Sequence, residues 1–171
     1  TVTVILPCRN EESWIIKALE SIIDGNYDTK SLEIIVIDGM STDNTRNLIA
    51  QFVEQHPNVR ILDNPQKTTP HALNLGIEAA RNDVIVRIDA HSEYPNDYIT
   101  KLIYWLTHTT ADNVGGIFVT QAANSSILAK AIAKGLSSRF GVGNSYFRVG
   151  ATQPMWVDTV PFGCFRKEVW V

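Results

Sequence analysis

Short apolar runs alternate along this chain with segments that have the spacing of amphipathic helices. The apolar runs lie at 2–6, 34–37, 59–62, 84–88 and 114–119, and their length and composition predict buried strands. After the first run, a spacing of three and four residues predicts a helix with an apolar face made by Trp14, Ile15, Ala18, Leu19, Ile22 and Ile23. The repeated order of strand and helix predicts an α/β fold with a mostly parallel central sheet and helices on both faces.

Prolines mark the bounds of the helices that are expected after the later strands. Pro57 ends the helix after the second strand, while Pro70 and Pro95 stand where the next two helices begin. Trp14 and Trp105 match the apolar faces of their helices, so both are expected in the core.

The last third of the chain has weaker signals. Apolar residues around 127–132 predict one more helix, and 155–160 is interpreted as a sixth strand. The stretch 140–153 is rich in Gly, Ser and Asn, which is typical of a loop. A length of 171 residues favours one domain. Because the chain stops within what looks like an ordered element, residues 1–171 are expected to be a domain truncated at its C-terminal end.

Composition excludes several classes of protein. The chain has 15 basic and 18 acidic residues, a balance that argues against a nucleic-acid binder. Two cysteines, Cys8 and Cys164, provide neither a disulfide framework nor a zinc site, and they are interpreted as reduced thiols of a cytoplasmic protein. No apolar run approaches the ~18 residues of a transmembrane helix, and the start of the chain has no signal-peptide pattern. Membrane association is therefore expected only through missing segments.

Polar side chains follow three of the predicted strands at the point where each strand ends. The segment 8–12 follows the first strand, Asp38 follows the second, and Asp89 and His91 follow the fourth. In open α/β sheets, ligands bind at the carboxyl ends of the strands. These residues are therefore the candidates for a binding site.

The chemistry of these side chains is suited to a nucleotide and a cation. Asp89 and His91 can converge on one divalent ion, which would neutralise a nucleoside diphosphate together with its phosphates, and the imidazole favours Mn²⁺ over Mg²⁺. The carboxylate of Asp38 can accept hydrogen bonds from a nucleobase or a ribose hydroxyl. Taken singly, each signal has a structural alternative: a capped turn before Pro95, a turn residue at Asp38, and a helix N-terminus at Glu11.

The order of the motifs is more specific than any one of them. The segments VILPCRNEE (4–12), IIVIDGMSTDNT (34–45), ALNLGIEAA (72–80) and VRIDAH (86–91) together resemble family 2 glycosyltransferases, which have the GT-A (Rossmann-like) fold. The resemblance covers nearly the whole chain. The Asp-Ala-His variant and the residues that follow it, 92–95, are similar to the succinoglycan-type branch, which builds bacterial polysaccharides.

The resemblance implies a role for each matching position. Pro7, Arg9 and Glu11 fall in the segment that lines the nucleotide base, and Asp38 matches the carboxylate that binds the base, usually uracil. Asp89 matches the first aspartate of a metal-binding Asp-x-Asp motif and also contacts the nucleotide, and His91 occupies the place of the second aspartate. A bound Mn²⁺ or Mg²⁺ is implied. The segment 159–165 resembles the one beside the acceptor site.

Three positions depart from the family pattern. Gly39 stands where a second aspartate often follows the residue at Asp38, so one polar contact is missing. His91 replaces an aspartate, which changes metal choice and affinity. The family's catalytic base lies in a downstream Glu-Asp motif, and no such motif appears before Val171. No catalytic base is therefore assigned within the chain.

The reaction implied by the resemblance is inverting transfer of a sugar from a nucleoside diphosphate sugar, expected to be UDP-linked, to a polysaccharide or lipid-linked acceptor. The resemblance also implies a place at the inner face of a bacterial membrane. A non-catalytic nucleotide-sugar-binding domain is the alternative. A Rossmann oxidoreductase is disfavoured because Pro7–Glu12 replaces the Gly-x-Gly-x-x-Gly turn. A nucleotidyltransferase is disfavoured because the N-terminus has no Gly-rich phosphate loop.

Overall fold

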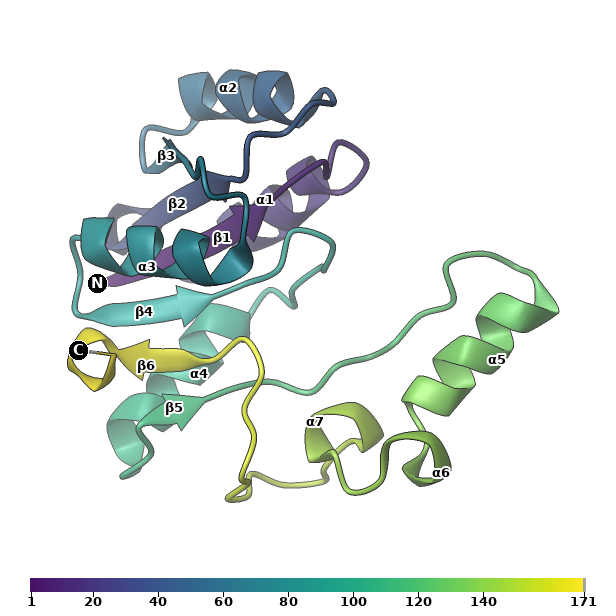
Figure 1. Cartoon of the computed structure of the whole chain (residues 1–171). Coiled ribbons are helices and arrows are strands. Elements are labelled where there is room, and N and C mark those ends of the chain that lie inside the picture. Colours follow the sequence, from purple (N-terminus) through teal and green to yellow (C-terminus); the bar gives the residue numbers. More distant parts are fainter. Residues whose placement is uncertain (171) are drawn as a thin grey trace. The chain divides into compact units, whose positions relative to one another are not determined.

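The structure is a computed structural model that describes residues 1–170. Its centre is a six-stranded sheet with the strand order β3-β2-β1-β4-β6-β5 (Figure 1). The strands are β1 (Val2–Cys8), β2 (Leu32–Asp38), β3 (Val59–Asp63), β4 (Val84–Arg87), β5 (Asn113–Val114) and β6 (Cys164–Arg166). The helices are α1 (Ile15–Ile23), α2 (Thr45–Gln55), α3 (Thr69–Ala79), α4 (Tyr98–His108), α5 (Ile127–Leu136), α6 (Arg139–Val142) and α7 (Tyr146–Val149), with 3-10 turns η1 (Thr29–Ser31) and η2 (Lys167–Val169).

The first four strands run parallel, as the alternation of strands and helices predicts. β1 pairs with β2 on one side and with β4 on the other, and β2 pairs with β3. β6 then runs antiparallel to both β4 and β5. The expected α/β class with a mostly parallel sheet is confirmed.

Side chains alternate between the two faces of β1, so each face of the sheet has its own core. Val4 and Leu6 pack on the face covered by α1, α2 and α4, whereas Ile5 packs on the face covered by α3. Figure 1 shows α3 crossing one face while α1 and α4 lie behind the other. Helices therefore cover both faces of the sheet, which leaves the strand ends as the place where polar loops meet.

Gly76 lets α3 lie close to the sheet. A Cβ at this position would stand 2.9 Å from Cδ1 of Ile37 and 3.0 Å from Cγ2 of Ile5. Both isoleucines are completely buried. The missing side chain is therefore part of the packing between α3 and the two central strands.

The first strand is longer than the predicted run 2–6 and includes Pro7. β1 continues through it to Cys8, and Pro7 stays in register with Ile37 of β2. The backbone carbonyl of Ile5 accepts the N–H of Ile88 on the side of β1 that faces β4. Backbone groups two residues apart in a strand point to the same side, so the nitrogen of Pro7 also faces β4. The pairing of β1 with β4 ends at Ile5, so the missing N–H of proline leaves no ladder bond unmade.

The apolar runs at 114–119 and 155–160 do not form the strands that the sequence predicts. Only Asn113–Val114 pairs in the sheet, and it pairs with β6, which occupies the position beside β4. Residues 155–160 are not in a strand, and the expected loop at 140–153 contains the short helices α6 and α7. Apolar character alone does not determine which run finds a partner strand.

Two tryptophans that match helix faces lie at the surface rather than in the core. Trp14 is 46% exposed and Trp105 is 37% exposed. Trp14 precedes the first residue of α1 and carries Lys17 over its ring, while Trp105 stacks edge-on against Tyr104. Large aromatic rings often keep part of their surface in water.

The chain divides into two compact units. One comprises Thr1–Val114 and Phe162–Val171, and it contains the whole sheet. The other is Gly115–Pro161, which contains α5, α6 and α7 and an edge-to-face contact between Phe118 and Phe147. Among the described residues, no helix combines the length and the apolar character needed to cross a membrane.

Candidate functional site

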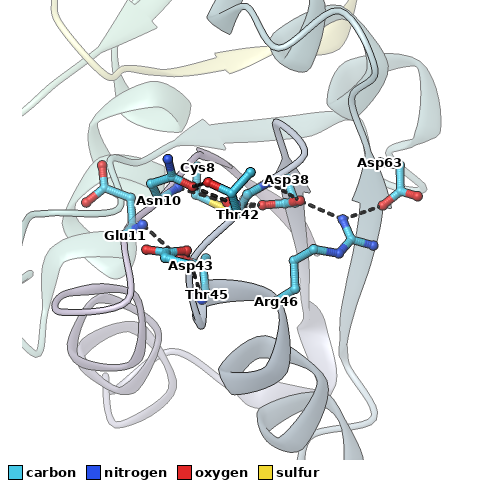
Figure 2. A network of polar contacts seen from close by, with 10 residues as sticks. Cys8, Asn10, Glu11, Asp38, Thr42, Asp43, Thr45, Arg46 and Asp63 are labelled. Carbon is cyan, nitrogen blue, oxygen red and sulfur yellow. Dashed lines mark hydrogen bonds and ion pairs between the residues drawn. The ribbon is translucent and has the colours of Figure 1, made fainter.

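Four loops leave the carboxyl ends of β1, β2, β3 and β4 at one edge of the sheet. The adjacent pairs Cys8–Asp38 and Asp38–Asp63 lie in register across the ends of β1, β2 and β3. Figure 2 shows how the side chains of the first three loops converge. This edge is where ligands bind in sheets of this kind.

The loops after β1 and β2 hold each other through hydrogen bonds. Asn10 donates its backbone N–H to Ser41 Oγ, and its side-chain Oδ1 accepts the N–H of Thr42, both at 2.8 Å. Glu12 accepts the N–H of Asn44 and donates its own N–H to Asp43. Asn10 and Met40 both have φ 56°, a left-handed conformation that these reciprocal bonds sustain.

Asp43 accepts two backbone N–H groups near the start of α2. Its Oδ1 accepts the N–H of Thr45, and its Oδ2 accepts the N–H of Glu12. Desolvation raises the pKa of the Asp43 carboxyl, but hydrogen bonds from Thr45 and Glu12 outweigh it and hold that pKa below its usual value. The hydroxyl of the neighbouring Ser41 donates to Asp38.

Asp38 is completely buried, and its carboxylate is fully engaged within the protein. Its Oδ2 accepts the N–H of Ser41 at 3.0 Å and Nη1 of Arg46 at 2.6 Å. Its Oδ1 accepts the hydroxyl of Ser41 and faces Sγ of Cys8 at 3.9 Å. A carboxylate has about four acceptor positions. The structure therefore leaves Asp38 without a free acceptor, and its present partners fix the start of the 39–46 segment.

Arg46 is a residue that sequence reasoning missed. Its Nη1 lies 2.6 Å from Asp38 and 2.8 Å from Asp63, so one guanidinium bridges the ends of β2 and β3 (Figure 2). Hydrogen bonds to Asp38 and then to Asp63 raise the pKa of Arg46 above its usual value. No spacing rule links positions 38, 46 and 63, so only the fold reveals this bridge.

Cys8 completes the buried side of this network. Burial, and then the negative charge of Asp38, raises the pKa of its thiol well above the usual value. Both Cys8 and Cys164 are buried and free. The structure therefore gives Cys8 a packing role as a neutral thiol rather than a role as a nucleophile.

A second cluster joins the loop after β1 to the loop after β4. The imidazole of His91 lies between two carboxylates: its Nδ1 is 3.1 Å from Oε1 of Glu11, and its Nε2 is 3.0 Å from Oδ2 of Asp89. The side chain of His91 is 56% exposed, whereas those of Glu11 and Asp89 are largely covered. Glu11 and His91 are 80 positions apart, so the sequence did not pair them.

The backbone supports both carboxylates of this cluster. The N–H of Glu11 donates to Oγ1 of the buried Thr45, and the N–H of Asp89 donates to the hydroxyl of Tyr94 at 2.6 Å. Burial raises the pKa of Tyr94 well above its usual value, so this residue stays a neutral phenol. Glu11 and Asp89 are therefore held by groups that do not change charge near neutral pH.

The donor atoms of Asp89 and His91 are spaced as two neighbouring ligands of one cation. Adjacent ligands of an octahedral ion with bonds of about 2.1 Å lie about 3.0 Å apart, and Nε2 of His91 lies 3.0 Å from Oδ2 of Asp89. Within residues 1–170, no group of three His, Cys, Asp or Glu side chains could hold a metal ion. The described residues therefore bring together only this pair of possible cation ligands, and its 3.0 Å contact is also that of an ion pair.

Pro7 and Arg9 stand at the β1 end of the same edge. Pro7 lies within the strand, and the exposed Arg9 lies over Gly39, where a Cβ would approach Cβ and Cδ of Arg9 at 3.2 and 3.3 Å. The glycine that departs from the family pattern thus makes room for the stem of Arg9. The structure brings Glu11, Asp89 and His91 together and gives Asp38 a separate set of partners.

A cavity of about 220 Å³ opens at the opposite edge of the sheet, beside the amino ends of β2 and β3. Its lining includes Glu33, Arg60 and Arg81. Glu33 accepts from Thr3, from Nε of Arg60 and from the N–H of Arg81, so its carboxylate is already paired. The cavity carries no residue of the candidate site, and its position argues for a structural role.

Comparison with known proteins gives a consistent result. A family model described as "Glycosyl transferase family 2" matches residues 3–166. Succinoglycan biosynthesis protein ExoA of Rhizobium meliloti (strain 1021) is 34% identical over 150 residues, which cover 86% of this chain and 44% of that protein. A dolichyl N-acetyl-alpha-D-glucosaminyl phosphate 3-beta-D-2,3-diacetamido-2,3-dideoxy-beta-D-glucuronosyltransferase of Methanococcus voltae is 28% identical over 176 residues, or 98% of this chain and 53% of that protein. The chain thus spans about half the length of these relatives.

Solved structures show the same fold. Mannosyltransferase PcManGT from Pyrobaculum calidifontis, in complex with GDP-Man and Mn²⁺, has a TM-score of 0.64 and 30% identity over 68% of this chain and 35% of its own. TarS of S. aureus has a TM-score of 0.68 over 99% of this chain and 48% of its own, at 14% identity, and supports the fold alone. The sheet and its helices therefore form a GT-A fold, and the chain belongs to glycosyl transferase family 2.

Proposed function

We propose that residues 1–171 form the nucleotide-sugar-binding domain of an inverting glycosyltransferase. The donor is a nucleoside diphosphate sugar, and the acceptor is a polysaccharide or a lipid-linked saccharide. Membership of the family supports transfer of a sugar. The complex of PcManGT with GDP-Man and Mn²⁺ supports a nucleotide sugar and a divalent cation as ligands. We place the protein in the cytoplasm, at the inner face of the cell membrane.

The observation that carries this proposal is the pair of donor atoms on Asp89 and His91. Their 3.0 Å separation suits two adjacent ligands of Mn²⁺ or Mg²⁺. A nitrogen ligand favours Mn²⁺, and diphosphate oxygens would complete the coordination. A bound cation stabilises the negative charge that develops on the leaving diphosphate.

Glu11 orients His91 in this proposal. Its carboxylate lies 3.1 Å from Nδ1 and would accept a hydrogen bond in the tautomer that keeps Nε2 free to ligate a cation. The sequence expectation placed Glu11 with the nucleotide base. The contact with His91 favours a role beside the cation instead.

Pro7, Arg9 and Asp38 line the nucleotide in this proposal, with Asp38 beside the base. All acceptor positions of Asp38 are taken by Ser41, Arg46 and Cys8. A base that donates directly to Asp38 therefore has to displace Arg46, which keeps Asp63 as its partner. UDP is the expected nucleotide, and we assign no catalytic base to the chain.

Calorimetry on the 171-residue chain tests the proposal. UDP and GDP are titrated with and without Mn²⁺ into the unaltered chain, into Asp89→Ala and into Asp97→Ala. Asp97 is a matched control because its carboxylate pairs with Lys101 and takes part in none of the contacts of the candidate site. We expect Mn²⁺-dependent binding of UDP that is lost in Asp89→Ala and kept in Asp97→Ala.

Each other result has a definite meaning. Unchanged Mn²⁺-dependent binding in Asp89→Ala contradicts the assignment of the cation ligand. A preference for GDP keeps the transferase assignment and changes the donor class. If neither nucleotide binds, the proposed site is wrong.

A second variant tests the role of Glu11. Loss of a partner that orients a ligating histidine costs about 10- to 100-fold in metal affinity. We expect Glu11→Gln to weaken the Mn²⁺ dependence by that factor while nucleotide binding without metal stays unchanged. An equal loss with and without Mn²⁺ would place Glu11 at the base, as the sequence expectation has it.

A further inference from the structure

Arg87, the last residue of β4, is a partly buried arginine whose guanidinium has no acidic partner. Within residues 1–170, neither an ion pair nor a hydrogen bond engages this guanidinium, and its Nε is buried without an acceptor. Arg46 and Arg60, which are also partly covered, both pair with carboxylates. Charges that are withdrawn from water are normally paired, because an unpaired buried charge is costly. The state of Arg87 therefore requires an explanation.

The guanidinium of Arg87 lies over an aromatic ring. Its Cζ is 4.8 Å from the centroid of the Phe162 ring. Phe162 has φ 47°, a left-handed conformation that is unfavourable for a bulky residue. The neighbouring backbone is fixed, because the N–H of Arg87 donates to the carbonyl of Gly163 and a Cβ at Gly163 would overlap the side chain of Asn113. A strained segment thus holds the ring against one face of Arg87.

A ring on one face leaves the edge of the guanidinium available for hydrogen bonds. Arginine carries its N–H donors in a planar fork that suits phosphate and carboxylate oxygens. It stays protonated at physiological pH, so the partner that suits it is an anion. No acidic side chain of the described chain takes that place. Arg87 therefore has the properties of a binding group that is held ready for an anionic ligand.

Arg87 lies on the same side of the chain as Asp89 of the candidate site. Val86, Ile88 and Ala90 all pack in the core that α1, α2 and α4 cover. The alternation of side chains thus continues past the end of β4, and it places Arg87 and Asp89 together on the other side. Two residues along an extended chain are about 7 Å apart. An anion bound near the carboxylate of Asp89 is therefore within reach of the long side chain of Arg87.

We propose that Arg87 binds the diphosphate of the nucleotide sugar through the donors at its edge, while Phe162 positions the guanidinium from its face. This inference rests on the proposed function, because it assigns a contact for the diphosphate in the same donor site. The contact is made by the protein itself and needs no metal. Its contribution to binding is therefore present both with and without a divalent cation, unlike that of Asp89 and His91.

Calorimetry on the 171-residue chain tests the proposal with three ligands. UDP is titrated with and without Mn²⁺, and uridine and inorganic pyrophosphate are titrated without metal. Arg87→Met keeps a long side chain and removes the charge and the donors. Loss of hydrogen bonds to a charged group is expected to weaken binding of UDP and of pyrophosphate about 10- to 100-fold. Uridine has no phosphate, so its binding should not change. Arg87→Lys keeps the charge without the fork and should restore only part of the affinity.

Arg81→Met is the matched control. Arg81 precedes β4 as Arg87 ends it, so it lies at the opposite edge of the sheet, and its side chain is 78% exposed. The same loss of charge at this position should leave binding of all three ligands unchanged.

Thermal unfolding separates a binding role from a structural one. Because Arg87 has no acidic partner in the described chain, Arg87→Met should unfold at the temperature of the parent chain or above it. A clearly lower midpoint, or an equal loss of uridine binding, would assign Arg87 a structural role and overturn the proposal. So would equal losses in Arg81→Met.

The outcomes also distinguish this inference from the proposed function. Mn²⁺-dependent binding of UDP that is unchanged in Arg87→Met overturns the role of Arg87 and keeps the donor site. Binding of pyrophosphate that depends on Arg87, with UDP bound no more tightly, supports the role of Arg87 and contradicts the nucleotide assignment. If the parent chain binds neither UDP nor pyrophosphate, both proposals are wrong.

Discussion

Asp38 and Asp63 contact the same nitrogen of Arg46 but differ completely in burial. The side chain of Asp38 is 0% exposed, while that of Asp63 is 55% exposed. Replacing each aspartate by asparagine removes one charge beside the same guanidinium and keeps the side-chain shape. The two variants therefore separate the effect of burial from the effect of the partner.

The structure gives different magnitudes for the two changes. Hydrogen bonds to a buried charged group contribute about 1.5–3 kcal/mol each, and Asp38→Asn weakens those from Arg46 and Ser41 and turns an amide NH₂ toward their donors. Arg46 keeps Asp63, so no buried guanidinium is left unpaired. We therefore expect Asp38→Asn to lower the free energy of unfolding by about 3 kcal/mol, near the lower end for a broken buried pair. Asp63→Asn should cost less than about 1 kcal/mol because an exposed pair contributes little.

Urea unfolding followed by circular dichroism measures both variants against the parent chain. The reasoning is refuted if the two free energies agree within about 0.5 kcal/mol, or if Asp38→Asn is neutral. The result also bears on function. If Asp38→Asn loses nucleotide binding, the unfolding data decide whether the fold or the contact with the base was lost.

Four further perturbations test other features of the fold. Gly76→Ala should destabilise the fold by about 1 kcal/mol, because the cost of overpacking against Ile5 and Ile37 exceeds the gain in helix propensity; thermal unfolding measures this. A Cβ at Gly135 meets no atom within 4 Å, so Gly135→Ala should raise the helicity of α5, which far-UV circular dichroism measures. Desolvation raises the pKa of Glu33, but hydrogen bonds from Thr3 and Arg81 outweigh it and lower that pKa below its usual value. The ionised carboxylate therefore stabilises the fold above pH 4.5, and this contribution is lost as the pH falls further. Glu33→Gln should make the free energy of unfolding depend less on acid pH. A thiol reagent near neutral pH should leave Cys8 unmodified until the chain unfolds, because burial raises its pKa; fast modification of the folded chain would contradict this.

The parallel part of the sheet was predictable because each strand is an apolar run followed by a helical spacing. The runs that contain Ile5, Ile35 and Ile85 are buried on both faces, which is the situation such runs indicate. The antiparallel part was not predictable. The run at 114–119 has the composition of a strand, but pairing depends on which segment returns beside β4, and that segment is Cys164–Arg166. The composition of a segment indicates that it favours strand conformation, but it does not show which strand the segment pairs with.

The site was predictable in position and only partly in its contacts. Parallel strands bring their carboxyl ends to one edge, so Asp38 and Asp89 were correctly placed at strand ends from the sequence. The contacts that define their chemistry join residues distant in the chain. Glu11 contacts His91. Arg46 bridges the ends of two strands, but nothing in the sequence around this helical position indicates that role.

The antiparallel pairing of β5 with β6 has a consequence for how this protein can change. Val114 and Cys164 are register partners, so the segment between them starts and finishes at two neighbouring points about 5 Å apart. The segment is therefore equivalent to a long insertion between two paired strands, and the entropic cost of closing such a loop grows only slowly with its length. Its length and sequence can therefore diverge without disturbing strands β1–β4, so one sheet can be combined with many different inserts.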